Sequence, residues 1–314
     1  MTVLVTGATG LIGNNVVRHL LERQPDRKVR CLVRPGTDPA PLDGLSVEIV
    51  DGDVTDDASV SAACRSASAV IHCAALVHIG WAFRDDMHQT NVHGSQIVAN
   101  ASRSAGARLV HVSTTDTFRT GTARRIPYVE TKIAAEQTVR RTVEDGLDAV
   151  IINPSFVLGP NDWKPSSGRA LLAAATRWLP FAPRGNVSIC DARDVAAAIV
   201  KAAMEDTSQD QYVLKGHDTR WVDALRQFAV LGGRWQPICR FDPVVDRAVG
   251  LGGDVTGKLL RSELPVNSAM MQLARSSPPV DDGLVRSKLD YAGRPLEETL
   301  RDTWHWFKKQ GYTG

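Results

Sequence analysis

The chain has 314 residues, of which 43% are apolar and 23% are charged, and its formal net charge is +2. This length and apolar content predict one large domain or two coupled domains with a buried core, and exclude a disordered or fibrous chain. The small net charge and the lack of a long run of lysines and arginines argue against nucleic acid as a partner.

Cysteine usage and the first residues bear on the compartment. The five cysteines are an odd number without a C-x-x-C pair, which argues against a disulfide framework and against a zinc site. The chain opens as MTVLVTG, without the basic segment and apolar core of a secretion signal. It has no apolar run of about eighteen residues, so no integral membrane segment is expected. We therefore expect a cytoplasmic protein without a bound metal.

The first half of the chain alternates short apolar runs with helical patterns. TVLVTG at 2–7 predicts a strand, and LIGNNVVRHLLER after it places apolar residues on one helical face. Five further strands are predicted at residues 29–33, 47–50, 69–74, 108–113 and 149–153. Strands that alternate with helices in this way predict an α/β fold with a doubly wound parallel sheet of the Rossmann type.

The pattern changes after about residue 153. NPSFVLGPNDWKPSSG is rich in turn formers, a helix is predicted at about 192–204, and the region 233–290 is expected to be irregular. The last segment predicts a helix after a proline, with core contacts from Leu296, Leu300, Trp304 and Phe307.

These patterns predict two lobes. A Rossmann domain that binds NAD(P) is expected over 1–153, and a smaller substrate-binding lobe over 154–314. Within the second part, 186–205 is expected to return to the Rossmann domain.

Three glycines mark the junction of the first strand and helix: Gly7, Gly10 and Gly13 in TGATGLIG. Glycines at such a junction permit a tight turn, a close approach of the backbone to a pyrophosphate, and close packing of helix on strand. At the end of the second strand, an acidic residue suits the ribose of NAD and an arginine suits the 2′-phosphate of NADP. The chain has Arg34 there, which favours NADP over NAD.

Tyr128 and Lys132 are four residues apart in YVETK, at the start of a predicted helix. Residues at i and i+4 share one helical face, so the ammonium can lie near the phenol and favour its ionised form. Proton exchange with a hydroxyl or carbonyl then becomes feasible near neutral pH. Because such a pair is common by chance, its meaning depends on the surrounding motifs.

Six segments in order resemble the extended short-chain dehydrogenases/reductases, in the branch of the dihydroflavonol reductases and 3β-hydroxysteroid dehydrogenases: TGATGLIG, DGDVTD, VIHCAA, VHVSTT, YVETK and INPSFVLGP. The resemblance covers nearly the whole chain. It implies a catalytic hydroxyl from Thr114, with Thr115 as the alternative. It implies that Tyr128 is the acid/base, and that Lys132 lowers its proton affinity and holds the cofactor ribose.

The resemblance also implies a set of cofactor contacts. For two of them, Asp53 and Val54 after the third strand, an ordinary turn is the alternative interpretation. Besides Arg34, Tyr128 and Lys132, the expected contacts are Gly7, Thr9, Gly10, Leu11, Ile12, Gly13, Asp53, Val54, Ala74, Ala75, Pro154 and Val157.

The function implied is an NADP-dependent oxidoreductase that reduces a ketone or aldehyde, or oxidises the alcohol, on a fairly apolar small molecule. One alternative is a nucleotide-sugar epimerase with tightly bound NAD. A dehydratase is disfavoured, because such enzymes resemble one another in a Thr-Asp-Glu stretch where this chain has Thr114-Thr115-Asp116. A further alternative is a non-catalytic cofactor sensor, and the assembly that the family implies is a homodimer.

Three other groups have two interpretations each. At the strand positions His72, Cys73 and His111, buried, hydrogen-bonded side chains are expected rather than ligands. The loop after the fourth strand either lines the substrate pocket or only packs, and it contains His78, Trp81 and Phe83. Helix capping is favoured over ligand binding for Asp191, Arg193 and Asp194.

Overall fold

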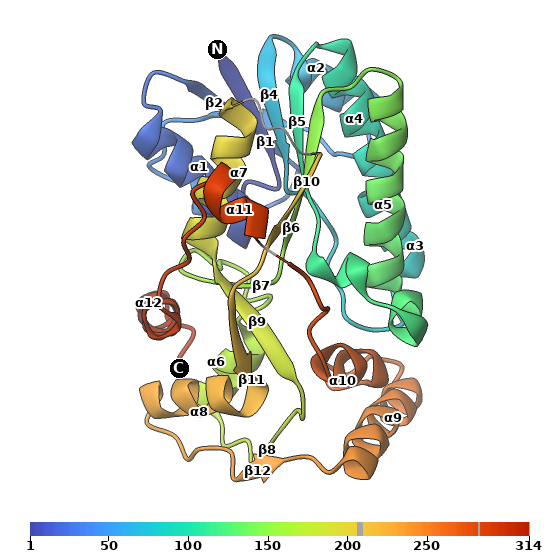
Figure 1. Ribbon diagram of the computed structural model, residues 1–314, viewed down its shortest axis with the longest axis vertical. Helices are drawn as coiled ribbons and strands as arrows, with labels where there is room; N and C mark the ends of the chain where they lie inside the picture. The colour runs from blue at the N-terminus through green and yellow to red at the C-terminus, as the bar shows by residue number, and fades with distance from the viewer. Residues whose placement is uncertain (206–209, 282, 314) are drawn as a thin grey trace.

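The computed structural model describes the chain except for residues 206–209, 282 and 314. Figure 1 shows a sheet with helices on both sides in the upper part of the molecule and a smaller lobe below it. Both parts are built from segments that are far apart in the sequence.

The main sheet contains, within the described ranges, seven parallel strands in the order β10-β6-β5-β4-β1-β2-β3. Their bounds are β1 (Thr2–Thr6), β2 (Lys28–Val33), β3 (Glu48–Asp51), β4 (Ala67–His72), β5 (Arg108–Val112), β6 (Ala149–Pro154) and β10 (Gln211–Leu214). The six predicted strands and the doubly wound fold are confirmed. The seventh, β10, was missed because four residues at a sheet edge carry little periodic signal.

Helices cover both faces of this sheet. One face packs against α1 (Leu11–Arg23), α7 (Ala192–Met204) and α11 (Gly283–Lys288). The other packs against α2 (Asp57–Cys64), α4 (Gly94–Ser104) and α5 (Pro127–Glu144). A short helix, α3 (Arg84–Met87), leads through a π-helical turn, His88–His93, into α4.

The lower lobe has two small sheets and five helices among the described residues. Its strands are β7 (Phe156–Leu158), β8 (Phe181–Ala182), β9 (Asn186–Asp191), β11 (His217–Arg220) and β12 (Cys239–Arg240). Its helices are α6 (Arg169–Thr176), α8 (Trp221–Leu231), α9 (Pro243–Leu260), α10 (Ser268–Ala274) and α12 (Leu296–Lys309). Across the part of the chain that is described, no helix combines the length and apolarity needed to cross a bilayer.

The sequence-based expectations for the second half were partly correct. The predicted helix at 192–204 is α7, and the tail helix α12 buries Leu300, Trp304 and Phe307. The expectation of an irregular region at 233–290 was wrong, because the 18-residue helix α9 lies within it. Its glycines lower the intrinsic preference for helix, but they let the helix pack closely on the segment that follows it.

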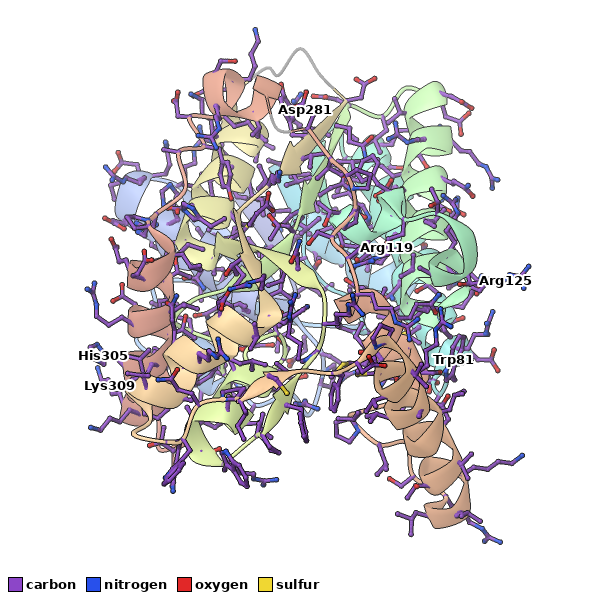
Figure 2. All side chains as sticks on the ribbon, turned by 60° about the horizontal axis from the view of Figure 1, so that its bottom comes forward. Trp81, Arg119, Arg125, Asp281, His305 and Lys309 are labelled. Atoms are coloured by element: carbon purple, nitrogen blue, oxygen red, sulfur yellow. The ribbon has the colours of Figure 1, made fainter. Side chains whose placement is uncertain are left out.

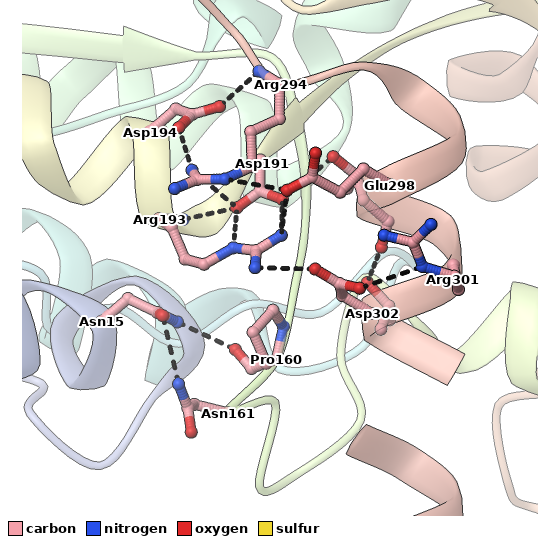
Figure 3. Close-up of polar contacts among 12 residues, drawn as sticks. Asn15, Pro160, Asn161, Asp191, Arg193, Asp194, Arg294, Glu298, Arg301 and Asp302 are labelled. Carbon is pink, nitrogen blue, oxygen red and sulfur yellow. Dashed lines mark hydrogen bonds and ion pairs between the residues drawn. The ribbon is translucent and has the colours of Figure 1, made fainter. Parts of the chain in front are cut away.

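A polar cluster joins α12 to the start of α7 (Figure 3). Asp191 caps α7 by accepting from the Arg193 nitrogen at 2.8 Å, and its two carboxylate oxygens contact the Arg193 guanidinium at 2.9 and 2.7 Å. The same guanidinium reaches Asp302 of α12 at 2.8 Å, and Asp194 pairs with Arg294. The capping prediction is confirmed for Asp191.

Candidate functional site

The turn between β1 and α1 lies at the carboxyl edge of the main sheet. Gly7 has a φ of +69°, and a Cβ on it would be 2.6 Å from the Ala74 nitrogen. A Cβ on Gly13 would be 2.2 Å from the Gly7 carbonyl oxygen, so this glycine lets α1 pack on the turn. Gly10 is exposed, and a Cβ there would meet only the Gly7 oxygen at 3.4 Å. The turn therefore offers open backbone at Gly10.

The N-terminus of α1 suits a phosphate. The helix has no side-chain cap at Gly10 and no acidic residue in its first turn, so its N–H groups and positive dipole end are available to an anion. Thr9 and Ile12 are partly exposed beside the turn, while Leu11 is buried. Asn14 braces the turn by donating to the carbonyls of Ala8 and Pro41 at 3.2 and 2.8 Å. These residues fit the pyrophosphate of a dinucleotide.

Arg34 and the turn after β3 lie beside the glycine turn on the same edge, since β2 and β3 follow β1 in the sheet. Arg34 is exposed directly after β2, and among the described residues its side chain has no hydrogen bond or ion pair. Asp53 accepts from the Thr55 nitrogen and hydroxyl at 2.9 and 2.8 Å, and Val54 beside it is buried. The Asp53 carboxylate thus stabilises its own turn, as the alternative interpretation required.

The carboxyl end of β5 brings Thr114 to α5. The Thr114 hydroxyl accepts from the Asp116 nitrogen at 3.2 Å, and its contact with the Tyr128 phenol lowers the pKa of that phenol. Thr115 is buried and makes no such contact with Tyr128. Of the two hydroxyls that the sequence left open, Thr114 is the one that acts on the pKa of Tyr128.

The environment of Tyr128 raises its pKa. Burial of the phenol is the main cause and the negative charge of Asp116 is the second, while the hydrogen bond with Thr114 partly offsets both. The Lys132 Nζ donates to the Val112 carbonyl at 2.8 Å, and its charge is not among the causes of this shift. At neutral pH the phenol is protonated, which is the form that can donate a proton.

Lys132 is buried on the same helix, one turn after Tyr128. Burial lowers its pKa to about 8, and the carboxylate of Glu136 is the largest opposing influence. Glu136 in turn accepts from the Ser113 hydroxyl and the Asn153 amide, both at 2.6 Å. Sequence analysis missed Glu136, although a Lys-x-x-x-Glu spacing places it on the same helical face as Lys132.

Asp116 is a second residue that sequence analysis did not place in the site. Its carboxylate pairs with the Arg119 Nε at 2.5 Å. Arg119 also donates to the carbonyls of Leu273 and Ser276, at 3.0 and 2.7 Å, at the end of α10. The acid beside Tyr128 is therefore held by an arginine that is itself anchored in the lower lobe.

Asn91 braces the segment after β4. Its side chain bonds both the nitrogen and the carbonyl of Leu76, at 2.7 and 3.0 Å, and donates to the Thr131 hydroxyl at 3.2 Å. Ala74 and Ala75, in this segment, are partly exposed next to the glycine turn. Asn91 lies in the π-helical turn, a geometry that often marks functional sites and that helical periodicity does not reveal.

The remaining predicted contacts lie at the end of β6. Pro154 ends that strand and Val157 is buried in β7. The strand order places β6 four strands from β2, a distance of roughly 19 Å at about 4.8 Å per strand. The predicted nicotinamide contacts and Arg34 therefore lie at opposite ends of one edge, as an extended dinucleotide requires.

The two strand histidines differ from each other. His72 is buried, with Nδ1 at 2.7 Å from the Thr6 hydroxyl and Nε2 at 3.1 Å from the Ser95 hydroxyl. His111 is also buried, but within the described residues neither of its ring nitrogens has a partner. The expectation of a hydrogen-bonded side chain is therefore wrong for His111. Burial lowers the pKa of His72 to about 3 and lowers that of His111, so both rings are neutral.

The loop after β4 is tied to the lower lobe. Glu263 accepts from His78 at 2.6 Å and from the backbone nitrogens of Trp81 and Ala82, at 2.6 and 3.0 Å. The side chains of Trp81 and Phe83 are exposed. The loop therefore packs through its backbone, through His78 and through the Trp81 indole nitrogen, which donates to Ser268 at 2.9 Å. Much of the Trp81 and Phe83 rings remains accessible.

A cavity of about 360 Å³ lies between β9, α9 and α10. The Arg275 Nε contacts one oxygen of Asp246 at 2.8 Å, and the other oxygen of this buried carboxylate has no partner among the described residues. The cavity is lined by Arg184, Gly185, Asn186, Pro243, Asp246, Arg247 and Arg275. Its three arginines suit a ligand with an anionic group.

The doubly wound sheet and the glycine turn at its edge define a NAD(P)-dependent oxidoreductase of the extended short-chain dehydrogenase/reductase class. The chain belongs to the NAD dependent epimerase/dehydratase family, whose model matches residues 3–214.

Two relatives and one solved structure illustrate the likeness. "Sterol demethylase protein B" of Methylococcus capsulatus is 31% identical, over 99% of each chain. "Ceramide reductase" of Caulobacter vibrioides is 29% identical, over 77% of this chain and 74% of the relative. The crystal structure of gox2253 is 25% identical, with a TM-score of 0.85 and coverage of 100% of this chain and 99% of the other.

Proposed function

We propose that this protein is an NADP-dependent reductase of a ketone or aldehyde on an apolar, lipid-like small molecule. The observation that carries the proposal is the Tyr128 phenol, held protonated beside the Thr114 hydroxyl at the carboxyl edge of the sheet. A general acid of this kind is what reduction of a carbonyl requires. The names of a sterol demethylase protein and a ceramide reductase among the relatives support an apolar substrate.

The residues that would hold the cofactor follow from the site. The turn from Gly7 to Gly13 fits the pyrophosphate, Arg34 would contact the 2′-phosphate, and Lys132 would contact the ribose. Pro154 and Val157 would lie against the nicotinamide. When bound, the cofactor supplies a hydride to the carbonyl carbon.

The chain itself supplies the proton and the positioning. The Thr114 hydroxyl donates a hydrogen bond to the carbonyl oxygen and stabilises the negative charge that develops there. Tyr128 then transfers its proton to that oxygen, which becomes the alcohol. Asp116 favours the protonated phenol, and Arg119 holds Asp116 in place.

The test is a panel of sterol ketones, long-chain oxo compounds, simple aldehydes and nucleotide sugars, with NADPH oxidation followed by absorbance. Purified protein is expected to lack bound nucleotide and to oxidise NADPH only when an apolar carbonyl compound is added. Copurification of stoichiometric NAD, with interconversion of nucleotide sugars at constant absorbance, would reject the reductase.

A nucleotide-sugar epimerase is the second candidate, and the arginine-lined cavity is the observation that favours it. A diphosphate could pair with Arg184 and Arg275. Under this alternative, Arg184→Ala should abolish turnover of nucleotide sugars. A reductase of uncharged lipids should retain its kcat in the same variant.

A further inference from the structure

One face of α9 is fixed against the segment that follows it. A Cβ on Gly253 would be 2.0 Å from the Val266 oxygen, and Cβ atoms on Gly250 and Gly257 would each be 3.0 Å from the backbone of that segment. The contact at Gly253 excludes a side chain and the other two are tight, so the helix cannot rotate about its axis without losing them. The opposite face must therefore point away from the protein.

That opposite face is apolar and uncovered. Residues at spacings of 4, 3, 4 and 4 form a single stripe along the helix, since these intervals keep to one helical face. We name this the α9 stripe, and its members are Val244, Ala248, Leu251, Val255 and Leu259. The exposed fractions are 74% for Val244, 60% for Leu251, 60% for Val255 and 78% for Leu259. Figure 2 shows α9 projecting from the lower lobe.

The charges that border the stripe are mainly basic. Arg247, Lys258 and Arg261 are exposed on or directly after α9. We name these three residues the basic border. A helix face that is apolar along its length and basic at its edge complements a layer of anionic groups with hydrocarbon beneath it.

The acidic residues of α9 and its N-cap lie off the stripe, and two of the three contact the protein. Asp246 is buried and paired with Arg275, and Asp254 accepts from the Ser268 nitrogen at 3.0 Å. Asp242 is the exposed acid, and it caps the N-terminus of α9 by accepting from the Val244 nitrogen at 2.9 Å. None of the three lies on the stripe.

We propose that the α9 stripe and its basic border dock this protein on an anionic lipid bilayer. The helix would lie in the plane of the interface with Leu251, Val255 and Leu259 among the acyl chains. A second copy of the chain fits this surface less well, because pairing two stripes would bring the two basic borders together. The proposal rests on α9 itself and stands whether or not the protein is a reductase.

Docking in this way would orient the candidate site. The segment between α9 and α10 holds the loop after β4 through Glu263, and the Trp81 indole donates to Ser268 of α10 at 2.9 Å. Arg119, which pairs with Asp116, is anchored at the other end of α10. The exposed rings of Trp81 and Phe83 would then lie next to the docking helix, where a lipid-like molecule could pass from the bilayer toward Tyr128.

The test is cosedimentation of the full chain with vesicles of phosphatidylcholine alone or mixed with phosphatidylglycerol. Wild type is expected to bind the anionic vesicles at least about tenfold more tightly than the neutral ones, and high salt should weaken the binding. Leu251→Ser with Val255→Ser should lower the partition coefficient at least about tenfold, through lost apolar burial. Lys258→Gln with Arg261→Gln should lower it on anionic vesicles only.

The matched control is Ile49→Ser, which removes an exposed apolar side chain from β3, in the main sheet and outside the lower lobe. It should bind vesicles as wild type does, and all variants should keep the wild-type circular dichroism spectrum and Tm. The proposal is overturned if wild type does not sediment with anionic vesicles, or if Ile49→Ser loses as much binding as the stripe variant. Dimerisation that depends on the stripe, without vesicle binding, would assign this face to a second copy instead.

Discussion

Gly7 and Ala74 meet across the carboxyl edge of the main sheet, where a Cβ on Gly7 would lie 2.6 Å from the Ala74 nitrogen. Gly7 also has a φ of +69°, a conformation that strains any residue with a side chain. The shape of the cofactor turn therefore depends on a backbone contact between β1 and the segment after β4. Gly10, three residues later, is free of both constraints, with a φ of −89°.

This difference predicts two distinct phenotypes for the same substitution. Gly7→Ala should lower the free energy of unfolding by about 2 to 4 kcal/mol, through backbone strain and a collision with Ala74. Gly10→Ala should change it by less than about 1 kcal/mol, yet raise the Kd for NADPH at least about tenfold, because a methyl group would stand where the phosphate approaches. Urea denaturation and fluorescence titration measure the two effects. If Gly7→Ala and Gly10→Ala lowered the free energy of unfolding equally, the proposed difference between the two glycines would be wrong.

Arg34 should decide the choice of cofactor. Its guanidinium is exposed at the end of β2 without a partner among the described residues, so a charge-assisted contact with the 2′-phosphate is available to it. Arg34→Ala should weaken NADPH binding by about 1.5 to 3 kcal/mol and leave NADH binding unchanged. Wild type that binds both cofactors equally would reject this role.

Substitutions of Tyr128 and Thr114 test separately the general acid and the group that binds the carbonyl oxygen. Tyr128→Phe keeps the ring but removes the transferable proton, so turnover should fall at least about a hundredfold while NADPH affinity stays the same. Thr114→Val should lower kcat at least about tenfold, because its hydroxyl would stabilise the developing charge. Thr115→Val is the matched control and should keep near-normal kcat. The assignment is wrong if Thr115→Val proves the more damaging of the two.

The buried ammonium of Lys132 makes stability depend on pH. Burial lowers its pKa from 10.5 to about 8, so between these pH values the unfolded chain binds more protons than the folded chain. The free energy of unfolding therefore rises as the pH rises from about 8 toward 10.5. Relative to Lys132→Met, which removes the titration, wild type should gain about 2 to 3 kcal/mol between pH 7 and 10.5. Urea midpoints across this range, measured for both proteins, check the sign; parallel curves would contradict it.

The cluster between α7 and α12 predicts unequal costs for its two aspartates. Asp191 is buried and bonds both the Arg193 guanidinium and the Thr299 hydroxyl. Asp191→Ala should lower the free energy of unfolding by about 3 kcal/mol, through a lost helix cap and a broken buried pair. Asp302 is partly exposed, so Asp302→Ala should cost at most about 1 kcal/mol. Thermal and urea denaturation of the two variants provide the comparison.

The sequence predicted best what depends on local pattern. Buried strands with continuous apolar runs, and the glycine turn at the first strand, were identifiable because their signals lie within a few neighbouring residues. The choice of Thr114, with Thr115 as the alternative, came instead from the resemblance to the family. The glycine-rich α9 was missed because its intrinsic preference is weak and its stability comes from contacts with the segment beyond it.

The details of the site that could not be predicted depend on residues distant in sequence. The charge of Asp116 acts on Tyr128, and Arg119 reaches carbonyls on α10. The bond from Lys132 to the Val112 carbonyl joins α5 to the end of β5, twenty residues earlier in the chain. Only the folded chain brings these groups together, since no periodicity of the sequence encodes them.

Strand β10 has a consequence for how the molecule folds and unfolds. The chain leaves the main sheet after β6, builds β7, β8 and β9, and then returns through α7 to add β10 beside β6. A fragment that stops at residue 153 would leave β6 as an unprotected edge and would strip α7 from α1, exposing aggregation-prone surface. We therefore expect the upper and lower parts to unfold in a single cooperative transition. A chimera that takes its lower lobe from a related protein should fold only if α7 and β10 come from that protein as well.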